Sequence, residues 1–561
     1  MERRAKSVDS KKRLAVTAPA KPQRPAKRVA IVGAGPSGLP SARHAILYGF
    51  RPVVFEMTGE VGGLWNYKPQ DSEEASVMKS TVINSSKEMS AYSDFPPKPD
   101  VANYMHNRKL LEYFQEYAEH YDLQKYIKFH HKIINVRKSV DYAVTGTWMV
   151  EYLDNNDGWH SEEFHGVLLC CGHHKVPHWP DKWPGQDEFK GSIVHSHDYK
   201  EPSAYEDKRV VAVGIGNSGA DVAVELSRVS EQVYLSTRRG AWILNRLHTG
   251  GMPLDTCMAR RFTHKLMYSV PRAIRAWYVQ RTINARFDHA VYGLQPEHDV
   301  LGAHTTQNDE LPIRIASGTI VVKPNIERFT EHDVHFVDGT KATNIDHVIL
   351  STGYDITFPI MEDKDIIKVR HNVVDLYKYM YPLDQTHNTF AVIGLIQPVG
   401  SIMPIAEMQA RVFFSVLSGE STLPSADEMR KDMLAKREAM KKQYVASYRH
   451  TIQVDYIPFM DELATIIGCR PRFWRLLLWD PPLAIAATFG PCAPYVYRID
   501  GPHKWDGARD AILGLPDRVK SGALPGYRPP TPRRGVSWPL IIIGFLVMVL
   551  PRILPYLQYF L

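Results

Sequence analysis

The sequence predicts an α/β fold with two Rossmann-like dinucleotide-binding domains and a hydrophobic segment at the C-terminus. The two domains are indicated by two glycine-rich turns. Each turn follows a short β-branched strand, at Arg28–Val32 or at Arg209–Val213, and leads into a helical pattern and a further strand. The third observation is an almost wholly apolar stretch at Val536–Leu550, which predicts a membrane anchor.

The first turn combines glycines with an acid at the end of the next strand. Gly33 permits the tight turn, Gly35 lets the backbone approach a pyrophosphate, and Gly38 allows the helix to pack closely on the strand. The helix N-terminus then faces the phosphate charge, and Glu56 can accept hydrogen bonds from ribose hydroxyls. The turn therefore predicts a nucleotide with free ribose hydroxyls. Its candidate contact residues are Gly33, Ala34, Gly35, Pro36, Ser37, Gly38 and Glu56.

The second turn repeats this arrangement with one chemical change. At the position that matches Glu56, the chain offers Ser236, Thr237, Arg238 and Arg239. Hydroxyl and guanidinium groups can bind a 2′-phosphate, which an acid would repel, so this unit predicts NADPH and the first unit FAD. Solvent-facing charges at a strand end remain the alternative for the two arginines. The candidate contact residues are Gly214, Gly216, Asn217, Ser218, Gly219, Ala220, Asp221, Thr237 and Arg238.

Composition adds limits on partners and chemistry. The chain has 561 residues, of which 44% are hydrophobic and 23% charged, as in an ordinary globular protein, and we expect no nucleic-acid partner. Its five cysteines form no CxxC pair and no metal-ligand spacing, so we expect a reducing compartment, no dithiol mechanism and no metal site. The net charge of +7 is concentrated in residues 1–27, which we interpret as a disordered basic tail.

The C-terminal apolar segment, residues 536–561, is less regular than a typical membrane span. Arg552 and several prolines interrupt it, so a tilted, partly inserted anchor is as plausible as a full crossing, and a buried core helix is the remaining alternative. By the positive-inside tendency, basic residues before the segment leave the preceding chain on the cytosolic side. These residues are Arg528, Arg533 and Arg534.

These features give an expected domain order. The FAD domain occupies 28–175, the NADPH domain is inserted at 176–335, and the FAD domain resumes over 336–535. Buried strands in Gly166–His174 and His347–Asp355 mark the crossings between domains, or are plain structural strands. Within the insertion, a basic helical part lies near 240–318. Its stretch Ala259–Phe287, rich in Tyr and Trp, either rests on an anionic membrane surface or is an ordinary packed basic helix.

Several further stretches resemble the microsomal flavin-containing monooxygenases. They are EVGGLWNY (Glu60–Tyr67), INSSKEM (Ile83–Met89), FKGSIVHSHDY (Phe189–Tyr199), GIGNSG (Gly214–Gly219), LSTRRGAWILNR (Leu235–Arg246) and STGYD (Ser351–Asp355). The pattern FxGxxxHxxxY discriminates best. Tyr199 in its last position favours the branch that oxygenates nitrogen and sulfur over the related Baeyer-Villiger enzymes, which usually have Trp there.

The resemblance implies roles for further residues. Gly63, Leu64 and Trp65 form an approach to the flavin, and the segment Ile83, Asn84, Ser85 contacts flavin and NADP. Asn84 is the predicted catalytic residue, because an amide can both donate and accept hydrogen bonds. A plain structural asparagine is the alternative. We expect His195 to organise the linker between the two nucleotide-binding domains rather than to bind a metal.

The resemblance also implies a reaction. NADPH reduces FAD, dioxygen adds to form a C4a-hydroperoxyflavin, and one oxygen atom passes to a soft nucleophilic nitrogen or sulfur of a small xenobiotic or metabolic substrate. Baeyer-Villiger oxygenation of ketones and NADPH oxidase activity are alternatives, as is a non-catalytic, membrane-attached flavin sensor or scaffold. We expect attachment to the endoplasmic reticulum membrane through lipid contacts of the C-terminal segment, with the catalytic domains facing the cytosol. A homo-oligomer is a further possibility.

Overall fold

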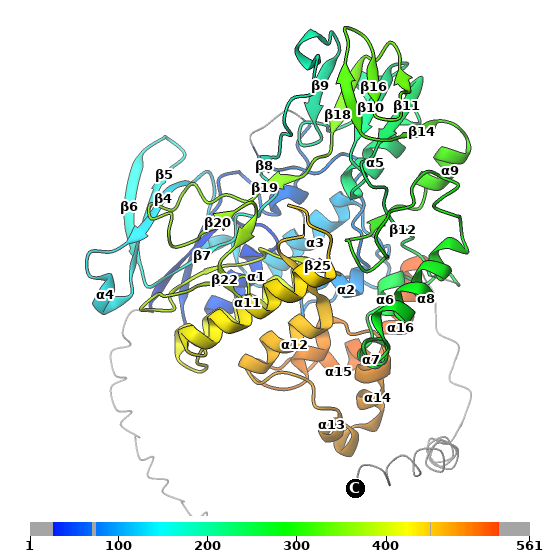
Figure 1. The fold of residues 1–561 in the computed structure, drawn as a ribbon. Helices are drawn as coiled ribbons and strands as arrows, with labels where there is room; N and C mark the ends of the chain where they lie inside the picture. The colour runs from blue at the N-terminus through cyan, green and yellow to red at the C-terminus, as the bar shows by residue number, and fades with distance from the viewer. Residues whose placement is uncertain (1–25, 70–73, 249, 449, 525, 527–561) are drawn as a thin grey trace, which may run out of the picture.

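The computed structural model describes residues 26–69, 74–248, 250–448, 450–524 and 526. Two five-stranded sheets, in which all strand pairs are parallel, form its framework (Figure 1). The basic tail predicted at 1–27 falls outside the described residues except for its last two positions. The predicted anchor at 536–561 falls outside them entirely.

The first sheet has the order β24-β7-β1-β2-β3. Its strands are β1 (Arg28–Val32), β2 (Arg51–Phe55), β3 (Ile127–Lys128), β7 (Gly166–Leu169) and β24 (Phe390–Val392). The central strands β1 and β7 are almost wholly buried, as expected for parallel strands that are covered on both faces. The largest hydrophobic core of the protein surrounds this sheet.

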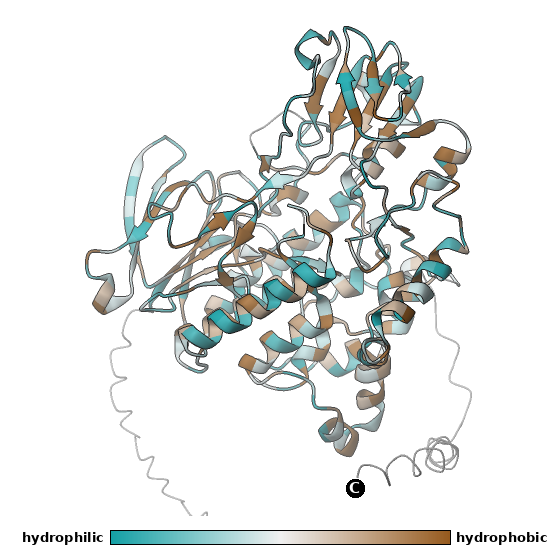
Figure 2. Cartoon of the chain, in the orientation of Figure 1, coloured by the Kyte–Doolittle hydropathy of each residue, from teal (hydrophilic) through white to brown (hydrophobic). Residues whose placement is uncertain are grey.

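The second sheet has the order β14-β11-β10-β18-β9 and lies at the top of Figure 1. Its strands are β9 (Ser192–His195), β10 (Arg209–Val213), β11 (Gln232–Ser236), β14 (Ile320–Lys323) and β18 (His347–Leu350). Alternate side chains of β10 enter two separate cores, because Val210 and Ala212 face one side of the sheet and Val211 and Val213 the other. Figure 2 shows hydrophobic residues along these strands.

The order of the strands along the chain places the second sheet inside the first. All five of its strands lie between β7 and β24. The expected boundary at residue 335 does not fit this sheet, because β18 hydrogen-bonds in parallel with β10 on one side and β9 on the other. We therefore propose that the inserted domain extends at least to Leu350, where the last strand of its sheet ends.

The two crossings between the sheets run side by side. The short strand β8 (Val176–Pro177), after the first sheet, pairs antiparallel with β19 (Tyr354–Asp355), after the second. The rings of His195 and Tyr354 lie 5.4 Å apart at this connection. His195 therefore packs against the linker.

Smaller sheets and the helices complete the fold. One antiparallel sheet consists of β4 (Lys132–Lys138), β5 (Trp148–Leu153) and β6 (Trp159–Phe164). Another consists of β15 (Ile326–Phe329), β16 (Val334–Phe336) and β17 (Lys341–Ala342). The remaining strand pairs are β12 (Ile243–Leu244) with β13 (Thr306–Gln307), β20 (Val369–Arg370) with β21 (Val373–Val374), β22 (Leu376–Tyr377) with β23 (Tyr381–Pro382), and β25 (Gln397–Val399) with β26 (Gln453–Asp455).

The helices of the nucleotide-binding part alternate with its strands. They are α1 (Gly38–Leu47), α2 (Lys87–Ser90), α3 (Asn107–His120), α4 (Tyr142–Thr145), α5 (Asn217–Leu226) and α9 (Leu311–Ala316). The C-terminal region adds α10 (Ile402–Ser418), α11 (Ala426–Gln443), α12 (Tyr456–Ile466), α13 (Phe473–Trp479), α14 (Pro481–Phe489), α15 (Ala508–Leu513) and α16 (Leu515–Ala523). Helix α10 packs against α1, the helix that begins at the last glycine of the first glycine-rich turn. The C-terminal region therefore supports the helix that follows this turn.

The basic stretch of the insertion is helical, as its pattern predicts, but Pro271 divides it. It forms α7 (Arg261–Ser269) and α8 (Arg272–Asn284), preceded by α6 (Leu254–Met258). Proline fixes its φ angle and lacks an N–H, so it ends one helix and begins the next. None of the helices in the described part of the chain combines the length and apolar character that crossing a membrane requires.

Candidate functional site

The first glycine-rich turn fits a nucleotide by leaving space at one position. Gly33 has a φ of +101°, and a Cβ added there would lie 2.8 Å from the carbonyl oxygen of Cys170. A Cβ at Gly38 would overlap the carbonyl oxygen of Gly33, so both glycines are required by the backbone itself. At Gly35 the nearest atom would be the Gly63 Cα at 3.5 Å, an ordinary contact. The protein alone leaves that space open, where a pyrophosphate would approach.

Backbone donors of this turn are also available. The N–H groups of Gly35 and Ser37, just before α1, donate to no group among the described residues. Free N–H groups at a helix N-terminus bind phosphate. The carbonyl of Pro36 accepts a hydrogen bond from the Tyr92 hydroxyl at 2.8 Å, which fixes the turn from the other side.

Glu56 reaches back to the turn rather than standing free. One carboxylate oxygen accepts the Ala34 N–H at 2.8 Å, and the other accepts the N–H and the hydroxyl of Thr58, each at 2.9 Å. A carboxylate offers about four lone-pair sites, so capacity remains for a ribose hydroxyl. The predicted contact with ribose stays a prediction.

The segment Gly63–Trp65 lies over the same turn. It forms the short 3-10 helix η1 (Gly63–Trp65), and the N–H of Gly62 donates to the Ala34 carbonyl at 3.1 Å. Leu64 and Trp65 are half-buried, and Trp65 packs against the main core. These side chains are therefore close to the turn, where the resemblance expects an approach to the flavin.

The second turn has the same backbone solution. Gly214 has a φ of +102°, and a Cβ there would lie 2.6 Å from the Ser351 carbonyl oxygen. A Cβ at Gly219 would overlap the carbonyl oxygen of Gly214. The N–H of Gly216, before α5, has no hydrogen-bond partner among the described residues. The turn at β10 is therefore also open to a phosphate.

The predicted side chains after this turn divide into exposed and engaged groups. Ser218 is exposed, whereas Ala220 is fully buried in a core of the second sheet. Asn217 Oδ1 accepts the Gln307 N–H at 2.9 Å, and Asp221 Oδ1 accepts from Asn308 Nδ2 at 2.8 Å. Burial raises the pKa of Asp221 to about 6. These polar groups thus connect α5 to the strand region around β13.

At the end of β11, two arginines are free of protein partners. Arg238 and Arg239 are exposed, and neither forms an ion pair or a side-chain hydrogen bond with any described residue. Thr237 is buried, and its hydroxyl accepts the Gly240 N–H at 3.1 Å. Two unpaired guanidinium groups beside a hydroxyl suit a 2′-phosphate, which can accept bidentate hydrogen bonds.

Asn84 is held by a residue that the sequence did not single out. Its Oδ1 accepts a hydrogen bond from Arg246 Nη2 at 2.7 Å. Arg246 also pairs with Asp309, through Nη1 at 2.9 Å and through its backbone N–H at 3.0 Å. With Oδ1 engaged, the Asn84 Nδ2 remains available to donate, since no described group accepts from it. Arg246 and Asp309 belong to the inserted part of the chain, so this contact bridges the two nucleotide-binding units.

The neighbours of Asn84 hold the backbone around it. The Ile83 N–H donates to the Met105 carbonyl at 3.0 Å, and the Ser85 hydroxyl lies 2.7 Å from that of Ser90. The Ser86 N–H donates to Asp255 Oδ2 at 2.6 Å. Burial raises the pKa of Asp255. The backbone of Ile83 and the side chain of Ser85 therefore stabilise the segment, and Asp255 is a second supporting residue that sequence reasoning missed.

The FxGxxxHxxxY stretch supports the second sheet. A Cβ at Gly191 would lie 2.6 Å from the Asp346 carbonyl oxygen, so only glycine fits beside the start of β18. His195 ends β9, and its Nδ1 accepts the His197 N–H at 3.0 Å. The Tyr199 hydroxyl donates to Glu225 on α5 at 2.8 Å. Each of these residues positions elements of the inserted domain.

Comparison with known proteins gives one consistent family. The family model described as flavin-binding monooxygenase-like matches residues 26–524. Human flavin-containing monooxygenase 5 is 46% identical over 497 residues, which cover 88% of this chain and 92% of the relative. Human flavin-containing monooxygenase 2 is 41% identical over 526 residues, which cover 93% of this chain and 98% of the relative.

Solved structures share the fold at lower identity. The S-allyl-L-cysteine S-oxygenase of Allium sativum superposes with a TM-score of 0.60 at 22% identity, covering 89% of this chain and 99% of its own. A cyclohexanone-bound cyclohexanone monooxygenase superposes with a TM-score of 0.58 at 13% identity, covering 79% of this chain and 98% of its own. At these identities the likeness concerns the fold.

Proposed function

Because the chain belongs to the flavin-binding monooxygenase-like family, we propose how its residues divide the work of an NADPH- and oxygen-dependent flavoprotein monooxygenase. The enzyme transfers one oxygen atom to a soft nucleophilic nitrogen or sulfur of a small molecule. FAD is assigned to the turn at β1 and NADPH to the turn at β10. The observation that carries this division is the contact of Asn84, beside the first unit, with Arg246 of the second.

The two turns differ in the charge that follows them. Bound FAD would accept hydride from NADPH and activate dioxygen, whereas the protein binds and orients the cofactors. Gly35 leaves room for the pyrophosphate of FAD. Glu56, directly after β2, would accept hydrogen bonds from the ribose hydroxyls of FAD. Arg238 and Arg239 would hold the 2′-phosphate of NADPH, because they are exposed and unpaired at the corresponding end of β11.

Asn84 serves oxygen transfer rather than hydride transfer in this proposal. Its Oδ1 is fixed by Arg246, so the direction of its Nδ2 hydrogens is fixed as well. An amide does not ionise, so it can hold a polar group by hydrogen bonds without delivering a proton. Asn84 would hold the nicotinamide and the flavin in a fixed relative position and so help to exclude water, and its loss would favour release of hydrogen peroxide over product.

The test separates the two half-reactions. Asn84→Ala is expected to leave the rate of flavin reduction by NADPH within about twofold, while the ratio of peroxide to oxygenated product rises about tenfold to a hundredfold, as the loss of one well-placed hydrogen bond would give. Stopped-flow absorbance measures reduction, and a thioether and a ketone are used as substrates for product analysis. Asn135→Ala on β4 is the control, because among the described residues its amide binds only Glu151 and Glu362.

Three results would contradict the assignment. If Asn84→Ala slowed reduction as much as oxygenation, Asn84 would act in hydride transfer. Product from the ketone alone would instead establish Baeyer-Villiger chemistry, and peroxide with neither product would establish an NADPH oxidase.

We also propose that the protein attaches to the endoplasmic reticulum membrane with its nucleotide-binding domains in the cytosol. Support comes from an apolar surface that we call the α7–α13 groove. It is a hollow of about 880 Å³ between α7, α13 and the end of α14, and Arg470 is among its lining residues. Trp474, which lines it, is 75% exposed, and the lining residues Phe262 on α7 and Phe489 on α14 are about half exposed. Trp479, at the end of α13 next to the groove, is 83% exposed.

A bilayer surface fits the α7–α13 groove better than open water. Exposed tryptophans with neighbouring arginines are typical of the membrane interface, where aromatic rings lie at headgroup depth and cations meet anionic lipid. The helix α13 projects at the lower edge of the molecule in Figure 1 and is largely hydrophobic in Figure 2. The predicted anchor follows the last described helix along the chain.

Lipid quenching tests this surface in the full-length protein. With vesicles that contain anionic and brominated phospholipids, quenching of tryptophan fluorescence is expected to fall strongly when Trp474 and Trp479 are both replaced by Ser. Trp159→Ser is the matched control, because that tryptophan is also exposed but lies on the strand β6 rather than on α13. Quenching that is unchanged in the double variant would exclude the groove from membrane contact.

A further inference from the structure

The segment that follows Asn84 is held by the C-terminal end of the described chain. Glu88, on α2, is fully buried, and its two oxygens are taken by two C-terminal residues. Oε1 accepts from Arg518 Nε on α16 at 3.0 Å, and Oε2 accepts from the Tyr495 hydroxyl on η5 (Pro494–Arg498) at 2.7 Å. Glu88 lies four residues beyond Asn84, on the helix α2, which begins three residues after Asn84.

Arg518 makes a second contact on the same segment. Its Nη2 donates to the carbonyl of Pro97, so one guanidinium joins the buried acid of α2 to the loop that follows. A guanidinium presents donors in a fixed fork, whereas a lysine ammonium is a single point on a flexible stem. Lysine could therefore replace the contact with Glu88 or the contact with Pro97, but not both in this geometry.

The rest of α16 packs on the same region without free space. Asn103 Nδ2 donates to the Val519 carbonyl at 2.8 Å, and a Cβ added at Gly522 would lie 2.8 Å from Lys87 Nζ and from Asn103 Oδ1. Lys87 is fully buried and donates to the carbonyls of residues 98, 99 and 101. Burial lowers its pKa to about 8. The segment between Asn84 and Asn103 thus has little freedom to move apart from α16.

We propose that Arg518 is a positioning residue for oxygen transfer, which sets the place of the Asn84 amide by fixing Glu88, four residues further along the same segment. The inference rests on the proposed role of Asn84. The position of the Asn84 amide would then depend in part on a residue more than four hundred positions away along the chain. That residue contacts α2 through Glu88. Small displacements of a positioned group are enough to lower catalysis strongly.

The experiment compares two lysine variants of equally buried arginines. Arg518 and Arg261 have side-chain exposures of 17% and 16%, and Arg261 forms a bidentate pair with Asp461 on α12. Arg518→Lys is expected to raise the ratio of peroxide to product about threefold to tenfold, while flavin reduction changes less than about twofold. Arg261→Lys should lower the midpoint of thermal unfolding about as much as Arg518→Lys does. It should leave the ratio of peroxide to product unchanged.

A second readout does not depend on turnover. Hydrogen-deuterium exchange of peptides that cover residues 83–94 is expected to accelerate in Arg518→Lys and not in Arg261→Lys. A segment that is held less firmly opens more often, and each opening breaks the hydrogen bonds of the Ser86 and Lys87 N–H groups to Asp255 and Asn103. If Arg518→Lys gives too little folded protein, Tyr495→Phe is used to test the same contact with Glu88. It removes only one hydroxyl from Glu88 and should raise the ratio about twofold to threefold.

The outcomes distinguish a failure of the role proposed for Arg518 from a failure of the role proposed for Asn84. If Asn84→Ala changes the ratio but Arg518→Lys and Tyr495→Phe do not, the positioning role is wrong and the role of Asn84 stands. If Asn84→Ala itself leaves the ratio unchanged, both are wrong. In the double variant Asn84→Ala, Arg518→Lys, the ratio should equal that of Asn84→Ala alone, because the positioned amide is gone. Additive effects in that variant would overturn the inference.

Discussion

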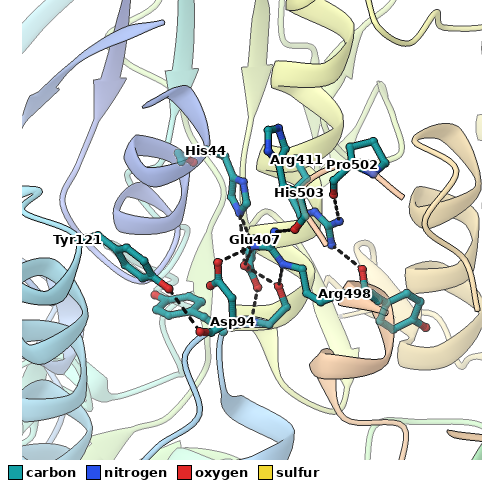
Figure 3. A network of polar contacts seen from close by, with 12 residues as sticks. His44, Asp94, Tyr121, Glu407, Arg411, Arg498, Pro502 and His503 are labelled. Atoms are coloured by element: carbon teal, nitrogen blue, oxygen red, sulfur yellow. Dashed lines mark hydrogen bonds and ion pairs between the residues drawn. The ribbon is translucent and has the colours of Figure 1, made fainter. Parts of the chain in front are cut away.

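Replacing Arg498 by Met should destabilise the protein more than any exposed charge replacement, because Arg498 stands at the centre of a buried polar network (Figure 3). The side chain is 1% exposed. Its Nη2 lies 3.0 Å from Asp94 Oδ2 and 3.2 Å from Glu407 Oε1. Its Nε donates to the Ser93 hydroxyl and its Nη1 to the His503 carbonyl, each at 2.6 Å. Met fills a similar volume but satisfies none of these groups.

The magnitude follows from what remains after the change. Two carboxylates, of Asp94 and Glu407, would stay buried without their shared cation, and breaking a buried ion pair in this way costs about 3 to 5 kcal/mol. Glu407→Gln should cost less, about 1 to 3 kcal/mol, because Arg498 keeps Asp94 and the amide oxygen can still accept from Ser93. In the double variant the cost should be smaller than the sum, since the two residues share one network.

Equilibrium unfolding in guanidinium chloride measures these costs. All variants are compared at one saturating FAD concentration, because a ligand that binds the folded state adds to its stability. Arg509→Met is the control, since Arg509 is half exposed and pairs with Asp480 at the surface, so its loss should cost about 0 to 1 kcal/mol. A cost below about 1 kcal/mol for Arg498→Met would refute the view that this network is held by charge pairing.

Three further changes test separate parts of the structure. Gly35→Val should give a folded protein with little bound FAD, because an added Cβ meets only the Gly63 backbone, at ordinary contact distance, while the side chain fills the space for the pyrophosphate. Normal flavin absorbance in the purified variant would disprove this. The double change Arg238→Ala, Arg239→Ala should narrow the preference for NADPH over NADH in reduction rates by about tenfold or more, and a full remaining preference would remove both residues from phosphate binding. Burial lowers the pKa of His289 to about 4, below the value near 6.5 expected in the unfolded chain, so the unfolded state binds more protons and stability falls as the pH drops from 6.5 toward 4. His289→Gln should reduce that slope by at most about 1.4 kcal/mol per pH unit, and unfolding curves at pH 6.5 and 5 would show an unchanged slope if His289 were protonated in the fold.

Local features were predictable from the sequence because their causes are local. Both turns lie within one strand and one helix, so their spacing alone predicts the elements β1, α1, β10 and α5 that the structure contains. The insertion of one domain in the other stays a prediction, which the position of all five strands of the second sheet between β7 and β24 supports. A boundary near 335 separates β18 from the sheet with which it pairs, since the apolar run of β18 is typical of a buried strand in either sheet and nothing local states which neighbours it pairs with.

The supports of the site were not predictable in this way. Arg246 and Asn84 are 162 positions apart, and Glu88 and Arg518 are 430 apart, so no spacing rule connects them. Lysine, glutamate and arginine are almost never fully buried unless paired, so a sequence leads one to place such residues at the surface. Here Glu88 and Arg498 are buried because partners from distant segments satisfy them.

The glycines of a dinucleotide turn have two different physical causes, and only one of them is evidence for a ligand. Gly38 and Gly219 are required because any Cβ would overlap the carbonyl of the first glycine of their own turn. Close packing of a helix on a strand would require them even where no nucleotide binds. At Gly35 the protein leaves ordinary van der Waals distance, so the absence of a side chain there is not explained by the fold. That unexplained space, together with Glu56 in one unit and the unpaired Arg238 in the other, is therefore what distinguishes two nucleotide sites from two similar strand-helix packings.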